Sequence, residues 1–147
     1  MYRILILIHV LAATVWVGGH LVLALTILPR ALRERDPGII RQFEDGYERI
    51  GIPALLIQVI TGFLLAYHWE PSVTAWFWPA TPQDSLITAK LSLLAVTVAL
   101  AAHARLKIIP TLSADRLRPL AGHIIAVTTI GVLMVTLGVA IRTGWLW

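Results

Sequence analysis

Four long apolar stretches constrain the fold of this 147-residue chain more than any other feature of its sequence. They cover about residues 4–28, 50–67, 86–104 and 120–141. Each approaches the roughly 20 residues that an α-helix needs to cross the hydrocarbon core of a membrane. Apolar residues make up 58% of the chain and charged residues only 14%, which excludes an ordinary soluble domain. We predict an all-α integral membrane protein, in which residues 1–147 form a single domain built as a four-helix bundle.

The basic residues predict how this bundle is oriented in the membrane. Nine of the twelve Lys and Arg residues lie in the first and third connections, whereas residues 69–85, the second connection, contain none. Because cytoplasmic loops carry an excess of Lys and Arg, we place the first and third connections in the cytoplasm. The N-terminus and the C-terminus then lie on the outer, periplasmic side of a bacterial inner membrane. This topology accounts for the net charge of +4, so the predicted partner is the lipid bilayer and no nucleic acid is expected.

The first connection carries a local helix signal. Asp36-Pro37 combines a favoured N-cap residue with proline at the first helical position, and apolar residues then recur at helical spacing. We expect an amphipathic surface helix over about residues 37–49 that runs into the second apolar stretch. Gly51 and Pro53 are expected to bend or break the junction between the two.

The tryptophans are concentrated at the predicted outer side. Five of the six fall there, which is typical of an aromatic belt at the membrane interface: Trp69, Trp76, Trp78, Trp145 and Trp147. An alternative is that the proline-rich segment 71–82 covers an outer site as a lid. Asp84 or Ser85 is expected to cap the third spanning helix.

Five histidines are the central functional signal, because ionisable residues within membrane spans are costly and usually face the bundle interior. His9 and His20 are eleven residues apart, which places both rings on one helix face at depths that differ by about 16.5 Å. The predicted topology sorts the remaining candidates by depth. His68 and Lys90 fall with His9 in the outer half, whereas His103 and His123 lie near the inner edge.

This layering predicts one or two sites for a metal or cofactor in the bundle core. Neutral imidazole ligates haem iron, copper and zinc, whereas the absence of cysteine excludes thiolate sites. At the outer site, His9 would pair with His68 or with Met134, which lies on the same helix face as His123. At the inner site, His20 would pair with His123 or His103.

Lys90 is a further candidate site residue besides the five histidines. It lies four residues after the start of the third apolar stretch. One interpretation is a lysine that extends to the membrane interface. The other is an ammonium group that pairs with a haem propionate or an anionic substrate at the outer site.

The segment His9-Val-Leu-Ala-Ala-Thr-Val-Trp16-Val-Gly18-Gly19 resembles the first-helix pattern of the copper-resistance protein D (CopD) family. In that family a histidine precedes a Trp-x-Gly-Gly element. The chain is also similar to HemJ-like haem-binding membrane proteins, whose first-helix histidine and third-helix lysine correspond to His9 and Lys90. The resemblance implies four spanning helices and either copper handling or a b-type haem with a redox function.

We therefore carry two principal hypotheses from the sequence. Since copper(I) favours Cys or Met ligands and the chain has no Cys and only two Met residues, histidines at two depths favour haem b. The protein would then transfer electrons, as a haem-dependent membrane oxidoreductase or a cytochrome b, with a quinone or a periplasmic redox protein as partner. The alternative is copper import or resistance through the same histidines, with His9, His20, His68 and His123 as metal ligands. A structural membrane subunit is a third hypothesis, and self-association is open under all three.

Overall fold

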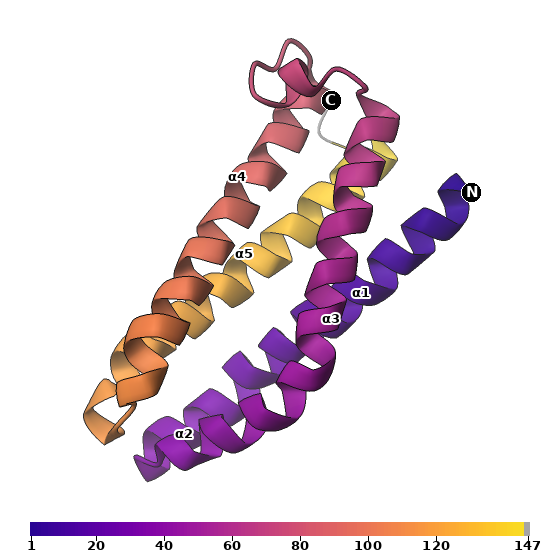
Figure 1. The fold of residues 1–147 in the computed structure, drawn as a ribbon. Helices are drawn as coiled ribbons and strands as arrows, with labels where there is room; N and C mark the ends of the chain where they lie inside the picture. The colour runs from indigo at the N-terminus through magenta and orange to yellow at the C-terminus, as the bar shows by residue number, and fades with distance from the viewer. Residues whose placement is uncertain (146–147) are drawn as a thin grey trace.

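Four long apolar helices make up almost the whole computed structural model, which describes residues 1–145 (Figure 1). Helical segments Tyr2–Glu34, Pro37–Trp69, Pro82–Thr111 and Ala114–Thr143 are each long and apolar enough to cross a membrane. The main elements are α1 (Tyr2–Val22), α2 (Leu28–Glu34), α3 (Pro37–Trp69), α4 (Pro82–His103) and α5 (Leu117–Thr143). Short helical segments lie between them. Of those described, two are π-helical, η1 (Leu23–Ile27) and η3 (Ala104–Ile108), and three are 3-10 helices, η2 (Val73–Trp76), η4 (Ile109–Thr111) and η5 (Ala114–Arg116). The predicted all-α membrane protein with four spanning helices is confirmed.

The helices pack in a definite order that leaves the centre of one half open. α1 packs against α3 and α5, and α4 packs mainly against α5 (Figure 1). A buried apolar cluster fills the half that contains the α2–α3 and α4–α5 connections, with Leu28, Ile40, Leu117 and Leu120 at its centre. The other half holds both described ends of the chain and lacks such a cluster among its described residues.

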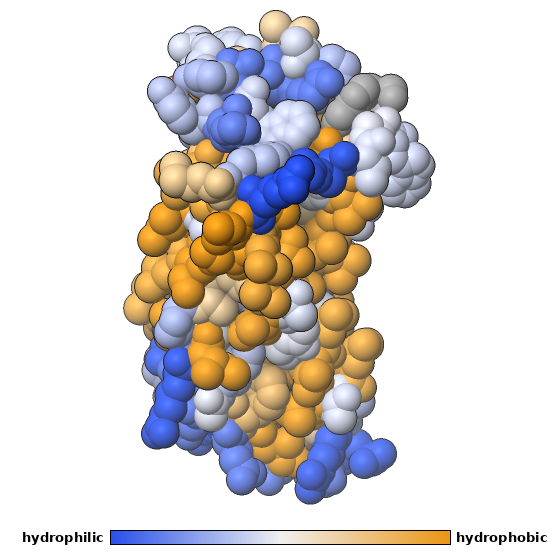
Figure 2. All heavy atoms as spheres, turned by 90° about the vertical axis from the view of Figure 1, so that its right-hand side faces the viewer, coloured by the Kyte–Doolittle hydropathy of each residue, from blue (hydrophilic) through white to orange (hydrophobic). Residues whose placement is uncertain are grey.

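The molecular surface agrees with a position in a membrane. Figure 2 shows a broad hydrophobic band on the face it presents, with hydrophilic residues gathered at the two ends. Large apolar side chains on the outside of the helices are exposed, among them Leu25, Leu56 and Val98. A surface with many exposed large apolar side chains is unfavourable in water and favourable in contact with lipid.

The residues predicted to form a surface helix that runs into the second apolar stretch are the first part of α3. α3 runs without interruption from Pro37 to Trp69, so segments 37–49 and 50–67 form one helix. Asp36 caps it as predicted, because its carboxylate accepts a hydrogen bond from the Gly38 amide at 2.7 Å. Pro53 lies inside the helix without ending it, and Figure 1 shows α3 changing direction along its length. A proline removes one backbone hydrogen bond, which bends a helix that is supported by its neighbours.

The third spanning helix begins earlier than the apolar pattern predicts. Its N-cap is Thr81, whose hydroxyl accepts from the Asp84 amide at 3.2 Å, while the Asp84 carboxylate accepts from the Thr81 amide at 2.9 Å. This reciprocal capping box satisfies two backbone donors that the helix itself leaves free. The prediction that Asp84 or Ser85 is the N-cap is therefore wrong by three to four residues, although Asp84 takes part in the cap.

The predicted aromatic belt contains side chains in different environments. Trp69, Trp78 and Trp145 are exposed, whereas Trp76 is buried and donates to the Glu70 carbonyl at 2.9 Å. Trp147 lies outside the described residues. Trp76 therefore anchors the connection between α3 and α4 to the bundle, and the exposed tryptophans have the character expected at an interface.

Candidate functional site

A central cavity of about 590 Å³ occupies the half of the bundle that holds the described chain ends. Residues of α1, α3, α4 and α5 line it, and most of the lining is apolar. The side chains with ligand or hydrogen-bonding chemistry that matter here are His9, Gln58, Lys90, Met134 and Arg142. An apolar wall with a small number of polar residues is typical of a site for a small ligand.

His9 is held in one orientation by the neighbouring helix α3. Its Nδ1 lies 2.9 Å from the Thr61 hydroxyl oxygen, and that hydroxyl donates its single proton to the Ile57 carbonyl at 2.6 Å. With the Thr61 proton on the Ile57 carbonyl, His9 donates from Nδ1, which leaves the lone pair on Nε2 free. Gly62 allows this approach, because a Cβ atom there would lie 3.3 Å from His9 Cε1.

Met134 and Lys90 line the same cavity from α5 and α4. Lys90 Nζ lies against the backbone of α5 at Gly138, where a Cβ atom would come within 3.3 Å of it. Within residues 1–145, no carboxylate lies within 4.0 Å of this ammonium group. Of the predicted pairings at the outer site, the structure brings His9 and Met134 to one cavity and places Lys90 beside them.

Gln58 is a polar residue of the cavity that the sequence pattern did not single out. Its side chain is only 9% exposed and lines the cavity, and its Oε1 is the one buried side-chain atom without a hydrogen-bond partner within the described residues. A buried acceptor without a partner is unfavourable and indicates a missing donor such as a ligand or water. In the sequence, Gln58 and Thr61 stand out as rare polar residues in the second apolar stretch. Hydrogen bonds between helices are an equally good explanation for polar residues at such positions.

His68 lies at the mouth of the cavity and does not line it. Its ring stacks on Tyr2 with centroids 4.3 Å apart. The Tyr2 hydroxyl accepts hydrogen bonds from Trp69 Nε1 at 2.8 Å and from Arg142 Nη1 at 3.2 Å. Tyr2 thus connects α1, α3 and α5 at this end. The predicted lid, residues 71–82, contributes no residue to the cavity lining.

His20 is separate from the other histidines in the described structure. Its Nδ1 donates to the Trp16 carbonyl at 2.9 Å, and its ring packs against Trp16 and Tyr47. The Tyr47 hydroxyl also donates to the Trp16 carbonyl, at 2.9 Å. His20 is therefore built into the contact between α1 and α3.

His103 and His123 form a hydrogen-bonded pair near the α4–α5 connection. His123 Nδ1 lies 3.0 Å from the Pro119 carbonyl, which can only accept, so this nitrogen carries a proton. In the neutral ring, His123 Nε2 then accepts from His103 Nδ1 at 2.8 Å, which leaves His103 Nε2 free. Arg105 and Glu48 form an ion pair at the same end.

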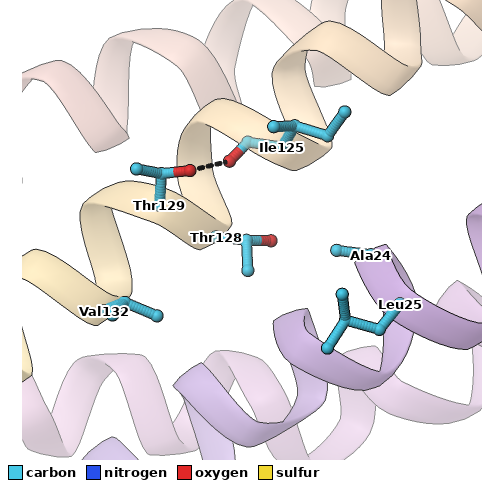
Figure 3. A pocket seen from close by; sticks show the side chains of 6 residues that line it. All are labelled: Ala24, Leu25, Ile125, Thr128, Thr129 and Val132. Atoms are coloured by element: carbon cyan, nitrogen blue, oxygen red, sulfur yellow. Dashed lines mark hydrogen bonds between the residues drawn. The ribbon is translucent and has the colours of Figure 1, made fainter.

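The predicted inner site is thus divided between His20 and the His103–His123 pair. The described residues contain no cluster of three or more His, Asp or Glu side chains arranged to hold a metal ion. A second hollow of about 400 Å³ lies between η1 and α5 and is lined by six residues without a titratable group (Figure 3). The hydroxyl of Thr129 is bonded to the Ile125 carbonyl at 2.8 Å (Figure 3). This hollow offers no ligand chemistry comparable with that of the central cavity.

Comparisons with known proteins identify the family. The family model described as copper resistance protein D (CopD) matches residues 41–141, which is most of α3 together with α4 and most of α5. No curated protein and no solved structure gave a significant match. The first-helix segment with His9 lies outside the matched range, and a relationship to HemJ-like proteins is not shown. Because the match covers more than half of the chain, this multi-pass membrane protein belongs to the copper resistance protein D family.

Proposed function

We propose that this protein binds copper(I) in the central cavity as part of copper import or resistance. The observation that carries the proposal is the fixed tautomer of His9, whose Nε2 keeps a free lone pair while Thr61 holds Nδ1. A hydrogen bond on the second ring nitrogen is the usual way in which proteins orient a metal-binding histidine. Met134 adds a thioether to the same cavity, and soft thioether ligands favour copper(I).

The family description supports the copper alternative over haem, which gets no support from the comparisons. The inner histidines do not distinguish copper from haem iron. His103 Nδ1 and His123 Nε2 are 2.8 Å apart and hydrogen-bonded, whereas two nitrogens on opposite sides of one metal ion are separated by about 4 Å when each bond is about 2 Å. This pair is therefore not spaced to hold a metal ion of either kind between its two bonded nitrogens.

Metal analysis together with a visible spectrum tests the proposal directly. We expect wild-type protein purified from copper-supplied cells under reducing conditions to contain about one copper per chain. Met134→Leu should retain its helices, because this exchange preserves volume, and bind copper(I) about tenfold more weakly, because a soft ligand is lost. A wild-type protein that contains haem, seen as a Soret band, and no copper would overturn the proposal.

Substitutions at Thr61 test whether its hydrogen bond to His9 positions that histidine for metal binding. Thr61→Val removes the acceptor for His9 Nδ1 and preserves the side-chain shape. Loss of such a supporting hydrogen bond lowers metal affinity by about tenfold or more. Thr61→Ser keeps the hydroxyl and should restore most of the affinity, as measured by competition with a copper(I) chelator. Equal affinities for all three proteins would show that Thr61 does not position the ligand.

The proposal places the cavity in the outer half of a bacterial inner membrane, with both chain ends outside. The excess of Lys and Arg in the first and third connections supports this orientation. Since the chain contains no cysteine, single cysteines can report it. Ser72→Cys should react with a membrane-impermeant maleimide in intact cells from which any outer membrane has been removed, and Ser113→Cys only after lysis. The opposite labelling pattern would invert the proposed orientation.

A further inference from the structure

The central cavity is too large and too cationic for a bare copper ion. Its volume of about 590 Å³ greatly exceeds the roughly 30 Å³ that one water molecule occupies in the liquid. Lys90 and Arg142 line it, and no Asp or Glu is among the lining residues. Within residues 1–145, the site therefore contains positive charge without a protein anion to balance it.

Arg142 and Lys90 differ in how far the protein itself satisfies them. Arg142 is exposed, donates to the Tyr2 hydroxyl at 3.2 Å and lies over the Tyr2 ring. Lys90 is half-buried against Gly138, and the described residues give it no carboxylate partner. Lys90 is consequently the group whose charge most requires a partner from outside the chain.

A bare copper(I) ion would make this imbalance worse. The protein donors available in the cavity, the imidazole of His9 and the thioether of Met134, are neutral. Copper bound to them would add a positive charge beside Lys90 in a mainly apolar environment, where repulsion between like charges is strong. A bound anion reverses the sign of this interaction, because it neutralises the metal and attracts the ammonium group.

We propose that the substrate of this cavity is a copper(I) complex that carries an anionic ligand, with His9 bound to the metal and Lys90 paired with the anion. The inference rests on the proposed copper function and names the chemical form of its substrate. Gln58 adds an unpartnered polar group to the same cavity. Its buried Oε1 lacks a donor, and a coordinated water or a ligand with an N–H or O–H group would supply one.

Bromide is the probe that tests this inference, because it binds copper(I) and is distinguishable from protein ligands by X-ray absorption. Wild-type protein in detergent is titrated with copper(I) in bromide and in tetrafluoroborate, with a chelator calibrated in each salt. We expect copper to bind about tenfold more tightly in bromide, with a bromine neighbour in the copper absorption spectrum.

Two lysine variants complete the experiment. Lys90→Met should lose the bromine neighbour and reduce the difference between the salts to less than about twofold. Lys107→Met, a matched change at an exposed lysine outside the cavity, should behave as wild type. If Lys90→Met does not fold, Lys90→Gln is used, and the wild-type spectrum remains decisive.

The outcomes separate the two proposals. Copper binding by the wild type that is equal in both salts, or a spectrum without bromine, overturns the anionic substrate and leaves copper binding in place. If Lys90→Met keeps the full difference in copper affinity between bromide and tetrafluoroborate, the assignment of the anion to Lys90 is wrong. Absence of copper from the wild type in both salts overturns the inference together with the proposed function.

Discussion

Replacing His9 by alanine should remove nearly all copper from the purified protein while the four helices remain. His9 is the only imidazole that lines the central cavity among the described residues, and Thr61 keeps its Nε2 free to bind a metal. Loss of a supporting hydrogen bond lowers metal affinity by about 10- to 100-fold, so loss of the ligand itself should exceed about 100-fold. Copper content per chain and chelator competition measure the effect.

His68→Ala provides the matched control for this experiment. His68 is exposed, stacks on Tyr2 and does not line the cavity. The variant should retain copper within about twofold of wild type, because His68 contacts the cavity wall at Tyr2 and does not itself line the cavity. If His9→Ala keeps its copper, or if His68→Ala loses it as completely, the assignment of His9 as the ligand is wrong.

Gly19→Ala should destabilise the protein by about 3 kcal/mol, near the upper end of the usual effect of overpacking. A Cβ atom on Gly19 would overlap the Tyr47 ring, and Gly51 confines the same ring because a Cβ there would lie 2.6 Å from it. Tyr47 therefore cannot move aside without separating α1 from α3 and losing its hydrogen bond to the Trp16 carbonyl. Unfolding of the purified protein in detergent, followed by circular dichroism, measures the loss.

Gly18→Ala is a neighbouring control with the opposite expected sign. No atom lies within 4 Å of a Cβ atom at Gly18, and alanine is favoured over glycine inside a helix by up to about 1 kcal/mol. Gly18→Ala should therefore leave the unfolding midpoint unchanged or raise it. Similar midpoints for both variants would show that the Tyr47 ring does not hold α1 and α3 in this arrangement.

The sequence predicts the helices well because a helix needs about 20 apolar residues to cross a membrane. It also places His9 and Met134 at the same depth, and the structure brings both to one cavity. Helix continuity is harder to predict, since packing against neighbours allows α3 to continue past Pro53. The first helix is also longer than its apolar stretch, which ends at about residue 28. It begins at Tyr2 and continues through polar residues as far as Glu34.

The histidine pairing shows where counting residues along a helix is insufficient. Depth alone favours His123 as the partner of His20, yet His123 is bonded to His103 across the α4–α5 contact. Rotation of each helix about its axis decides such pairings, and packing sets that rotation. The role of Thr61 is hidden for the same reason, because only the close approach of α1 and α3 at Gly62 brings its hydroxyl to His9.

The continuity of α3 places contacts at two levels of the bundle on one helix. One end of this helix carries Thr61, which orients His9, and the other carries Tyr47 and Glu48, which bind the Trp16 carbonyl and Arg105. The contacts of α3 on the two sides of Pro53 are therefore all carried by a single unbroken helix.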